Sequence, residues 1–315
     1  MLFLIFANQA WSLEVAASIN PVHQIILSIG GDSNLIIKPG LSEHDYQLKK
    51  SDISALVKAD LIFYVDDSLE KNFPKLIKNF HLEKKSYQLS KITGINLLQC
   101  RNNSKKLDPH LWLDPENGIK IAEFVTQKFC ESDKKNCLKY QNNFQKFRQE
   151  ITKVESVIKS DLVGLDANYV IYHDAYQYFE KSFAIKAQKI ISYDHNSQLK
   201  VNDLRGLELV KCLVSERMDE RNSAQKLAEN YQIKFVTLDV IGGDESYAKL
   251  LTKIAQGFVK CAKKWDFLYR KKIMIFFGCS EIKAWWGVVC QKRGEVCLIL
   301  VNCRVANLIA MTWQK

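Results

Sequence analysis

The feature that most constrains the fold of this chain is a stretch of helical periodicity near its middle. Between residues 136 and 162, large apolar side chains recur at spacings of three and four among Lys, Glu, Gln and Asn; they are Phe144, Phe147, Ile151, Val154 and Ile158. Neither glycine nor proline interrupts the stretch. This period predicts one long amphipathic helix that divides the chain in two.

Short apolar runs alternate with helical patterns on both sides of this helix. Before it, strands are predicted at 13–19, 34–37 and 61–65, and helices from Pro21 to about 30 and at 53–58. After it, strands are predicted at 169–172, 190–191, 212–214 and 235–238, and helices around 222–230 and 246–262. Such alternation indicates βαβ units. We therefore predict an α/β fold of two lobes, each with a mainly parallel sheet flanked by helices.

The domain organisation follows from these patterns and from the two ends of the chain. We expect an N-terminal lobe at 13–134, an interlobe helix at 135–163 and a C-terminal lobe at 164–264. Residues 1–12 form an apolar run that ends in small residues, Ala10 and Ser12 around Trp11. This run resembles the back half of a secretory signal, although no basic residue precedes it, and we expect an exported protein.

Residues 265–315 differ in composition from the rest of the chain. They hold eight Lys or Arg against three acidic residues, which accounts for +5 of the formal net charge of +10. The remainder is not unusually basic, so the charge is a property of this tail and does not indicate nucleic-acid binding. Its apolar run from Val296 to Trp313 contains Arg304, which argues against a transmembrane span. The tail is either a frameshifted or read-through end, possessing no defined packing, or a functional appendage.

Three of the six histidines lie in loops beside acidic or aromatic residues. His44 lies in SEHDY, His110 in DPHLWLDP and His173 in VIYHDAY, directly after a predicted strand. Ligands of open α/β sheets bind outside the carboxyl ends of strands, and neutral imidazoles are good zinc ligands. The three are more than sixty residues apart and lack a local zinc signature, so spacing alone favours a hydrogen-bonded loop residue over a ligand for each histidine taken singly. The neighbouring carboxylates of Asp45, Asp108 and Asp174 are candidates to orient the rings.

Several motifs, in an unbroken order, place these histidines in context: SINPVH at 18–23, PGLSEHDY at 39–46, ADLIFYV at 59–65, DPHLWLDP at 108–115, HDAY at 173–176 and LDVIG at 238–242. From about residue 14 to 263, the chain closely resembles the periplasmic zinc-binding receptors of ABC-type zinc uptake systems. The resemblance implies two lobes joined by a rigid helix, with the metal bound between them.

The resemblance also implies which residues bind the metal. The family's ligand histidines correspond to His44, His110 and His173, and a histidine at the third position, where related manganese receptors tend to have Glu, favours zinc. The fourth ligand corresponds either to Asp239, which we slightly favour, or to Glu43. In the second lobe, Cys212 and Cys261 correspond to a disulfide of many zinc receptors. Apart from the resemblance, Cys130 and Cys137 flank a short turn, where they either pair or remain buried thiols.

The sequence departs from the resembled family at two further places. The stretch from Cys100 to Asp108 is short, whereas many zinc receptors carry a long loop rich in histidine and acidic residues there. The segment 215–220 keeps Glu216 but lacks the usual Glu-Pro-Gln-like pattern.

We thus expect a non-enzymatic, periplasmic receptor that captures Zn²⁺ as cargo and delivers it to a membrane permease with its ATPase. It would contact the membrane only through that permease, bind no nucleic acid and act as a monomer. Three alternatives are a manganese receptor or metal-binding adhesin of the same fold, a zinc hydrolase, and a decayed product without transport function. The hydrolase lacks support because neither His-Glu-x-x-His nor Gly-x-Ser-x-Gly occurs.

Overall fold

A computed structural model of the chain describes residues 13–41, 43–44, 46–165, 168–193, 204–216 and 221–262, together with two strands at 287–290 and 297–300. Residues up to Lys263 form one compact unit, and the residues from Lys264 onward form another. The signal-like segment 1–12 and most of the tail lie outside the described residues. The boundaries expected within the first unit, at 134 and 163, remain predictions.

The N-terminal lobe is built on a parallel four-stranded sheet of order β2-β1-β3-β4. Its strands are β1 (Val15–Ala17), β2 (Asn34–Leu35), β3 (Leu61–Tyr64) and β4 (Ser86–Gln88). The helices of this half are α1 (Asn20–Ile29), α2 (Lys50–Lys58), α3 (Phe73–Asn79) and α4 (Pro115–Ser132). β1 and β3 are buried throughout, as their continuous apolar sequences require of strands covered on both faces.

The C-terminal lobe repeats this plan with a second parallel sheet, of order β10-β9-β7-β8. Its strands are β7 (Tyr169–His173), β8 (Lys189–Ser192), β9 (Cys212–Ser215) and β10 (Lys234–Thr237). Its described helices are α6 (Gln177–Ser182), α8 (Arg221–Asn230) and α9 (Tyr247–Ala262). The predicted fold of two parallel-sheet lobes is confirmed.

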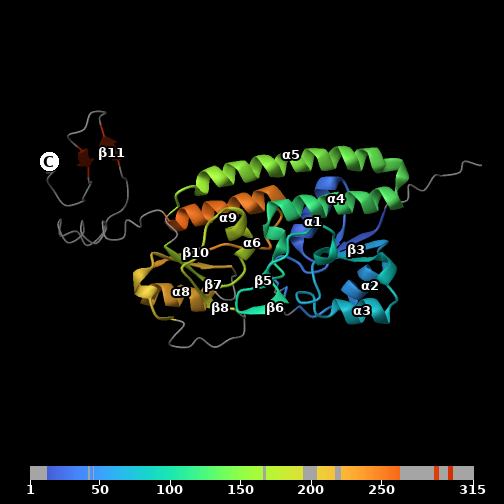
Figure 1. The fold of residues 1–315 in the computed structure, drawn as a ribbon, viewed down its shortest axis with the longest axis horizontal. Helices are drawn as coiled ribbons and strands as arrows, with labels where there is room; N and C mark the ends of the chain where they lie inside the picture. The colour runs from blue at the N-terminus through green and yellow to red at the C-terminus, as the bar shows by residue number, and fades with distance from the viewer. Residues whose placement is uncertain are drawn as a thin grey trace, which may run out of the picture. The chain divides into compact units, whose positions relative to one another are not determined.

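The long central helix is α5 (Cys137–Leu162), as its periodicity predicts. It packs against α4 at one end and α9 at the other, so it runs along both lobes (Figure 1). Its apolar stripe is buried along the length of the helix, from Tyr140 to Leu162. Earlier in the chain, between β4 and α4, lies an antiparallel hairpin of β5 (Gln99–Cys100) and β6 (Asn103–Leu107).

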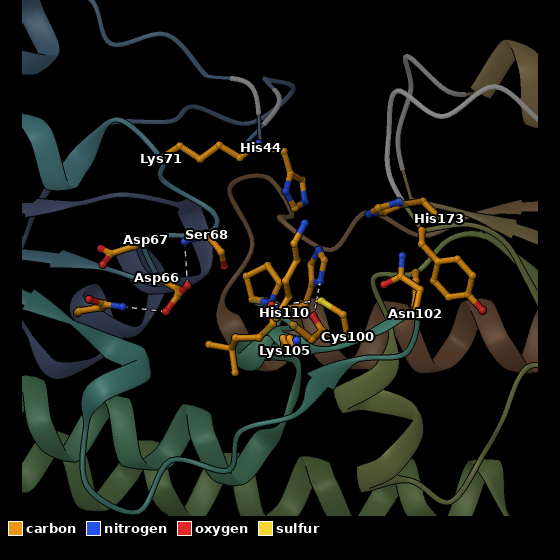
Figure 2. Close-up of a pocket in the computed structure, with 17 residues that line it drawn as sticks. His44, Asp66, Asp67, Ser68, Lys71, Cys100, Asn102, Lys105, His110 and His173 are labelled. Atoms are coloured by element: carbon orange, nitrogen blue, oxygen red, sulfur yellow. Dashed lines mark hydrogen bonds and ion pairs between the residues drawn. The ribbon is translucent and has the colours of Figure 1, made fainter.

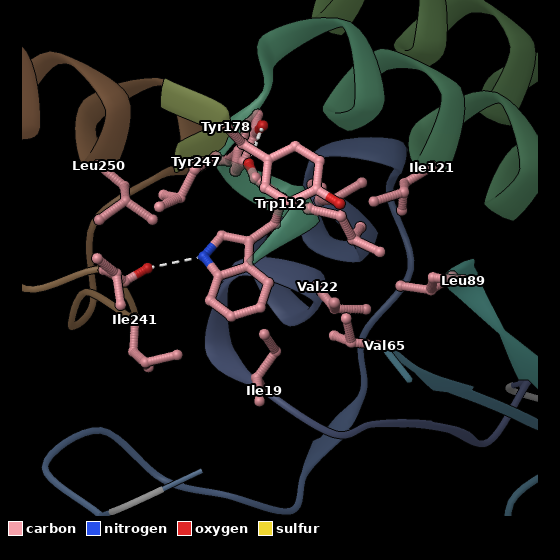
Figure 3. Close-up of a cluster of buried hydrophobic side chains, with 14 of the residues drawn as sticks. Ile19, Val22, Val65, Leu89, Trp112, Ile121, Tyr178, Ile241, Tyr247 and Leu250 are labelled. Carbon is pink, nitrogen blue, oxygen red and sulfur yellow. Dashed lines mark hydrogen bonds between the residues drawn. The ribbon is translucent and has the colours of Figure 1, made fainter. Parts of the chain in front are cut away.

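One continuous apolar core joins the two lobes. At its centre lies the fully buried indole of Trp112, whose Nε1 donates to the Val240 carbonyl at 2.8 Å (Figure 3). The Tyr247 hydroxyl in turn donates to the Trp112 carbonyl at 2.6 Å. That approach requires glycine at 118, because a Cβ there would lie 2.3 Å from the Tyr247 hydroxyl. The lobes are therefore interlocked by polar contacts within a shared core.

The second unit contains a described antiparallel pair, β11 (Gly287–Cys290) and β12 (Cys297–Leu300). In the part of the chain that the structure describes, no helix combines the length and apolar character needed to traverse a bilayer.

Candidate metal centre

Three histidines from separate segments meet in a cleft (Figure 2). His44 lies in the irregular segment between β2 and α2, His110 in the loop that follows β6, and His173 at the end of β7. Their ring centroids are 5.5 Å (His44–His110), 5.8 Å (His44–His173) and 6.1 Å (His110–His173) apart. One ring nitrogen of each lies within 4.8 Å of the others, a spacing that a single metal ion can bridge.

The site is dry on one side and open on the other. His110 and His173 are 2% and 4% exposed, whereas the His44 side chain is 16% exposed. The histidines line a cleft of about 840 Å³, which is far larger than an ion. An ion held here is thus shielded by the interior behind His110 and His173 and reached from the cleft beside His44.

The His110 ring is oriented by Asp108. The Asp108 Oδ1 lies 2.8 Å from His110 Nδ1 and also accepts the His110 backbone N–H at 3.0 Å. This contact directs Nε2 toward the other histidines, and Nε2 is buried without a hydrogen-bond partner among the described residues. Burial lowers the His110 pKa, but the carboxylates of Asp108, which contributes most, Glu43 and Asp174 together hold that pKa above its ordinary value. Of the carboxylates expected to orient the rings, Asp108 does so.

The other two carboxylates named for that role behave differently. Asp174 pairs with Arg101, at 3.1 Å from Oδ1 to Nη1. Burial raises its pKa to about 6, and Arg101 opposes that rise. Asp45 lies outside the described residues.

The two candidates for a fourth ligand occupy unlike environments. Glu43 is buried, and its Oε1 lies 3.8 Å from His44 Nε2. Asp239 is exposed, and its Oδ1 accepts the backbone N–H groups of Ile241 at 2.8 Å and Gly242 at 3.1 Å. Among the described residues, the group close enough to share one ion comprises the three histidines and neither carboxylate.

Two disulfides are present in the first unit. Cys212 in β9 is joined to Cys261 in α9, and Cys130 in α4 is joined to Cys137 at the start of α5. The remaining described cysteine outside β11 and β12 is Cys100, a free thiol that lines the cleft. Burial raises the pKa of the Cys100 thiol, which disfavours a thiolate ligand.

Tyr178 is predicted from the sequence as a residue of the core and cleft wall, but the contacts that hold the walls of this cleft were not predicted. Arg101 bridges two acidic residues of the second lobe, and Tyr178 bonds the base of the β5–β6 hairpin. No local pattern marks these contacts, because the partners lie 70 to 80 positions away.

Two parallel-sheet lobes, a long connecting helix and a histidine cluster between them define a metal-binding substrate receptor. Residues 15–261 match the ZnuA family, described as the periplasmic component A of the zinc-uptake complex, and the chain belongs to that family. It is thus an exported substrate-binding component of a metal ABC transporter and not an enzyme.

Individual relatives agree with this assignment. The high-affinity zinc uptake system protein ZnuA of Brucella suis is 24% identical over 306 residues, covering 79% of this chain and 92% of the relative. The manganese ABC transporter substrate-binding lipoprotein PsaA of Streptococcus mitis is 27% identical over 284 residues, covering 81% and 92%. Both a zinc and a manganese transport protein are therefore among its relatives.

Solved structures confirm the fold. A crystal structure of ZnuA superposes with a TM-score of 0.71 at 18% identity, covering 80% of this chain and 100% of the other. The periplasmic zinc-binding protein TroA from Treponema pallidum gives a TM-score of 0.70 at 18% identity, covering 81% and 100%.

Proposed function

We propose that the protein is a zinc receptor that binds one Zn²⁺ through His44, His110 and His173 and delivers it to an ABC permease. The observation that carries this proposal is the convergence of three imidazoles, from segments more than sixty residues apart, with ring nitrogens within 4.8 Å of one another. Structural zinc sites are almost always four-coordinate, and histidine nitrogens bind zinc at about 2.0–2.1 Å. Three such nitrogens form most of a tetrahedral shell.

The ligand chemistry favours zinc over manganese. Imidazole suits zinc, whereas carboxylate, carbonyl and water oxygens suit manganese. The zinc uptake protein of Brucella supports this choice. The Streptococcus mitis relative, named for manganese, keeps a manganese receptor or adhesin of the same fold as the second candidate.

Glu43 and Asp239 are both retained as proposed fourth ligands. The burial of Glu43 and its 3.8 Å distance to His44 favour it, because the carboxylate would complete the shell with little movement. Asp239 is exposed, and its Oδ1 accepts two backbone N–H groups. Ligation by Asp239 would therefore require either that its turn rearranges or that its second oxygen, Oδ2, binds the ion. This ranking reverses the preference drawn from the sequence.

Delivery requires partners outside this chain. We propose that the loaded receptor docks as a monomer on a membrane permease, whose ATPase drives import. Zinc enters from the open side of the cleft, exchanges its waters for the imidazoles and a carboxylate, and is shielded by the buried walls behind His110 and His173.

Metal analysis of the purified protein tests the proposal. We expect one zinc per chain, preference for zinc in competition with manganese, and loss of stoichiometric binding in His44→Ala, His110→Ala and His173→Ala. His81→Ala is the matched control, because His81 is an exposed histidine of the same lobe as His44. Unchanged zinc content in the three variants would overturn the proposed site, and stronger retention of manganese would favour the second candidate.

A further inference from the structure

The hairpin that leads to His110 is fastened to the segment that follows His173. Its two-residue turn begins with Arg101, and its second strand runs into Asp108 and His110. The facing segment runs from His173 at the end of β7 through Asp174 to α6. Contacts between these two segments therefore fix the distance between two of the three histidines.

At the tip of the hairpin, the Arg101 guanidinium bridges two carboxylates of the second lobe. Nη1 lies 3.1 Å from Asp174 Oδ1, and Nη2 contacts Glu180 Oε2. Both carboxylates are buried, with side chains 7% and 2% exposed, and the side chain of Arg101 is 24% exposed. A planar guanidinium with several fixed donors suits such a double contact, which a lysine ammonium reproduces only in part.

Glu180 is itself held in place independently of Arg101. Its Oε1 accepts from the Tyr169 hydroxyl at 2.7 Å and from the Ala187 backbone N–H at 2.6 Å. Glu180 is therefore a fixed anchor for the guanidinium. The side chain that Arg101 constrains in turn is Asp174, the residue directly after His173.

The base of the same hairpin is fixed by α6. The Tyr178 hydroxyl accepts the Leu98 backbone N–H at 2.9 Å and donates to the Asp108 carbonyl at 3.0 Å. The Gln177 side chain adds a bond from Nε2 to the Gln99 carbonyl at 3.1 Å. The hairpin is thus held at its base by neutral hydrogen bonds from α6 and at its tip by the ion pairs of Arg101.

We infer that Arg101 is a positioning residue of the metal site, which fixes the His110-bearing hairpin against the His173-bearing strand end. This inference rests on the proposed function, because it assigns to Arg101 an effect on metal affinity. Arg101 acts through Asp174 and Glu180 and does not itself ligate the ion.

The charge of Arg101 and its position in the hairpin predict opposite effects of its removal on metal affinity. Arg101 is a cation near a cation site, so by Coulomb repulsion alone its removal should tighten metal binding. If Arg101 instead holds two ligands in register, its removal should weaken binding. Groups that orient metal ligands typically contribute roughly 10-fold to 100-fold in affinity.

Zinc affinity of Arg101→Met, measured by competition with a chelating dye, distinguishes these effects. Lys105→Met is the matched control, since Lys105 is an exposed residue on the same hairpin, lines the cleft and has no ion pair among the described contacts. We expect roughly 10-fold to 100-fold weaker binding for Arg101→Met, unchanged or tighter binding for Lys105→Met, and partial recovery in Arg101→Lys. The absorption spectrum of bound Co²⁺ should change in Arg101→Met and remain as in wild type in Lys105→Met, because it reports ligand geometry.

The other outcomes distinguish failure of the inference about Arg101 from failure of the proposed function. Equal or tighter binding by Arg101→Met, with an unchanged Co²⁺ spectrum, overturns the inference and leaves the proposed function intact. Failure of the wild-type protein to bind zinc overturns the proposed function itself. If Arg101→Met does not fold, Arg101→Lys and Arg101→Met/Glu180→Gln carry the same comparison, because both reduce the uncompensated buried charge.

Discussion

Replacement of Asp108 by Asn tests how much of the zinc affinity comes from the residue behind a ligand. Asn keeps the size of the side chain but removes its charge. In the wild-type protein the Asp108 carboxylate lies 2.8 Å from His110 Nδ1 and is 3% exposed. It therefore polarises the imidazole from a nearly dry position.

The expected magnitude follows from this geometry. Adding the imidazole ring and a zinc–nitrogen bond of about 2 Å to the Nδ1 contact puts the carboxylate roughly 7 Å from a bound ion. With an effective dielectric constant of about 20, its attraction for a divalent ion is then about 5 kcal/mol, an upper bound. Part of this attraction is offset by the desolvation of Asp108, and Asn still accepts the Nδ1–H bond. We expect a loss of about 1.4 to 2.7 kcal/mol, or roughly 10-fold to 100-fold in Kd.

Titration against a competing chelator at several pH values measures this loss. Asp67→Asn is the control, because Asp67 is an exposed carboxylate of the same cleft that bonds the Tyr64 hydroxyl, not a histidine. The gap between wild type and Asp108→Asn should narrow as the pH falls. Asp108 raises the His110 pKa, so the wild-type ligand is protonated first. In the variant that contribution is gone, and burial lowers the His110 pKa against the remaining carboxylates of Glu43 and Asp174.

Two results would refute this reasoning. Wild-type affinity in Asp108→Asn would mean that the contact contributes nothing to binding. An equal loss in Asp67→Asn would mean that the total charge of the cleft, and not the orientation of His110, determines affinity.

Three further predictions concern stability and shape. Removing the Cys212–Cys261 disulfide, by Ala at both positions, should lower the free energy of unfolding in urea by about 4 kcal/mol, since it closes a loop of 49 residues. Burial raises the Glu70 pKa to about 7, so the protonated form of Glu70 stabilises the fold. This contribution to stability is complete below pH 4.5, the pKa in the unfolded chain, and is lost as the pH rises through 7. Relative to Glu70→Gln, the wild type should thus lose about 3 kcal/mol between pH 4.5 and 8. The radius of gyration from X-ray scattering should be the same with and without zinc, because the lobes share one core.

Each of these has its own control and contrary result. Removing the Cys130–Cys137 disulfide, with a sequence separation of 7, should cost less, about 2.5 kcal/mol, and the reverse order would contradict the loop-length reasoning. A pH-independent difference between Glu70→Gln and wild type would show that Glu70 keeps an ordinary pKa. A radius that contracts on adding zinc would mean that the lobes close like a hinge.

Periodic patterns in the sequence predicted the parts of the fold that have strong periodicity. The stripe along α5 and the apolar runs of β3 and β7 each specify one kind of element, and the structure contains them at the expected positions. The sequence reasoning did not identify α4 (Pro115–Ser132), although Asp114 caps it and Pro115 begins it, because the stretch before it was treated as a motif. The β5–β6 hairpin was missed because its strands are short and polar and its stability comes from contacts with α6.

The candidate site was predicted only through the order of its motifs. Spacing along the chain does not indicate that His44, His110 and His173 meet, since their convergence depends on how β7 and the β5–β6 hairpin pack. The residues that hold the ligands in place were harder still to predict from the sequence. Arg101 carries no local signal, because its two partners are on the other lobe and become neighbours only after folding.

The rigid join between the lobes has a consequence for how an ion is bound. Asn20 in α1 donates to the carbonyls of Ile241 at 3.0 Å and Gly243 at 2.7 Å. Trp112 donates to the carbonyl that precedes them in this loop, that of Val240. A receptor tied in this way gains little burial from closing its lobes, so burial of the ligands must exist before the ion arrives. The low exposure of His110 and His173 meets that requirement. Because little ordering remains to be done on binding, affinity depends on how accurately the surrounding side chains hold the imidazoles.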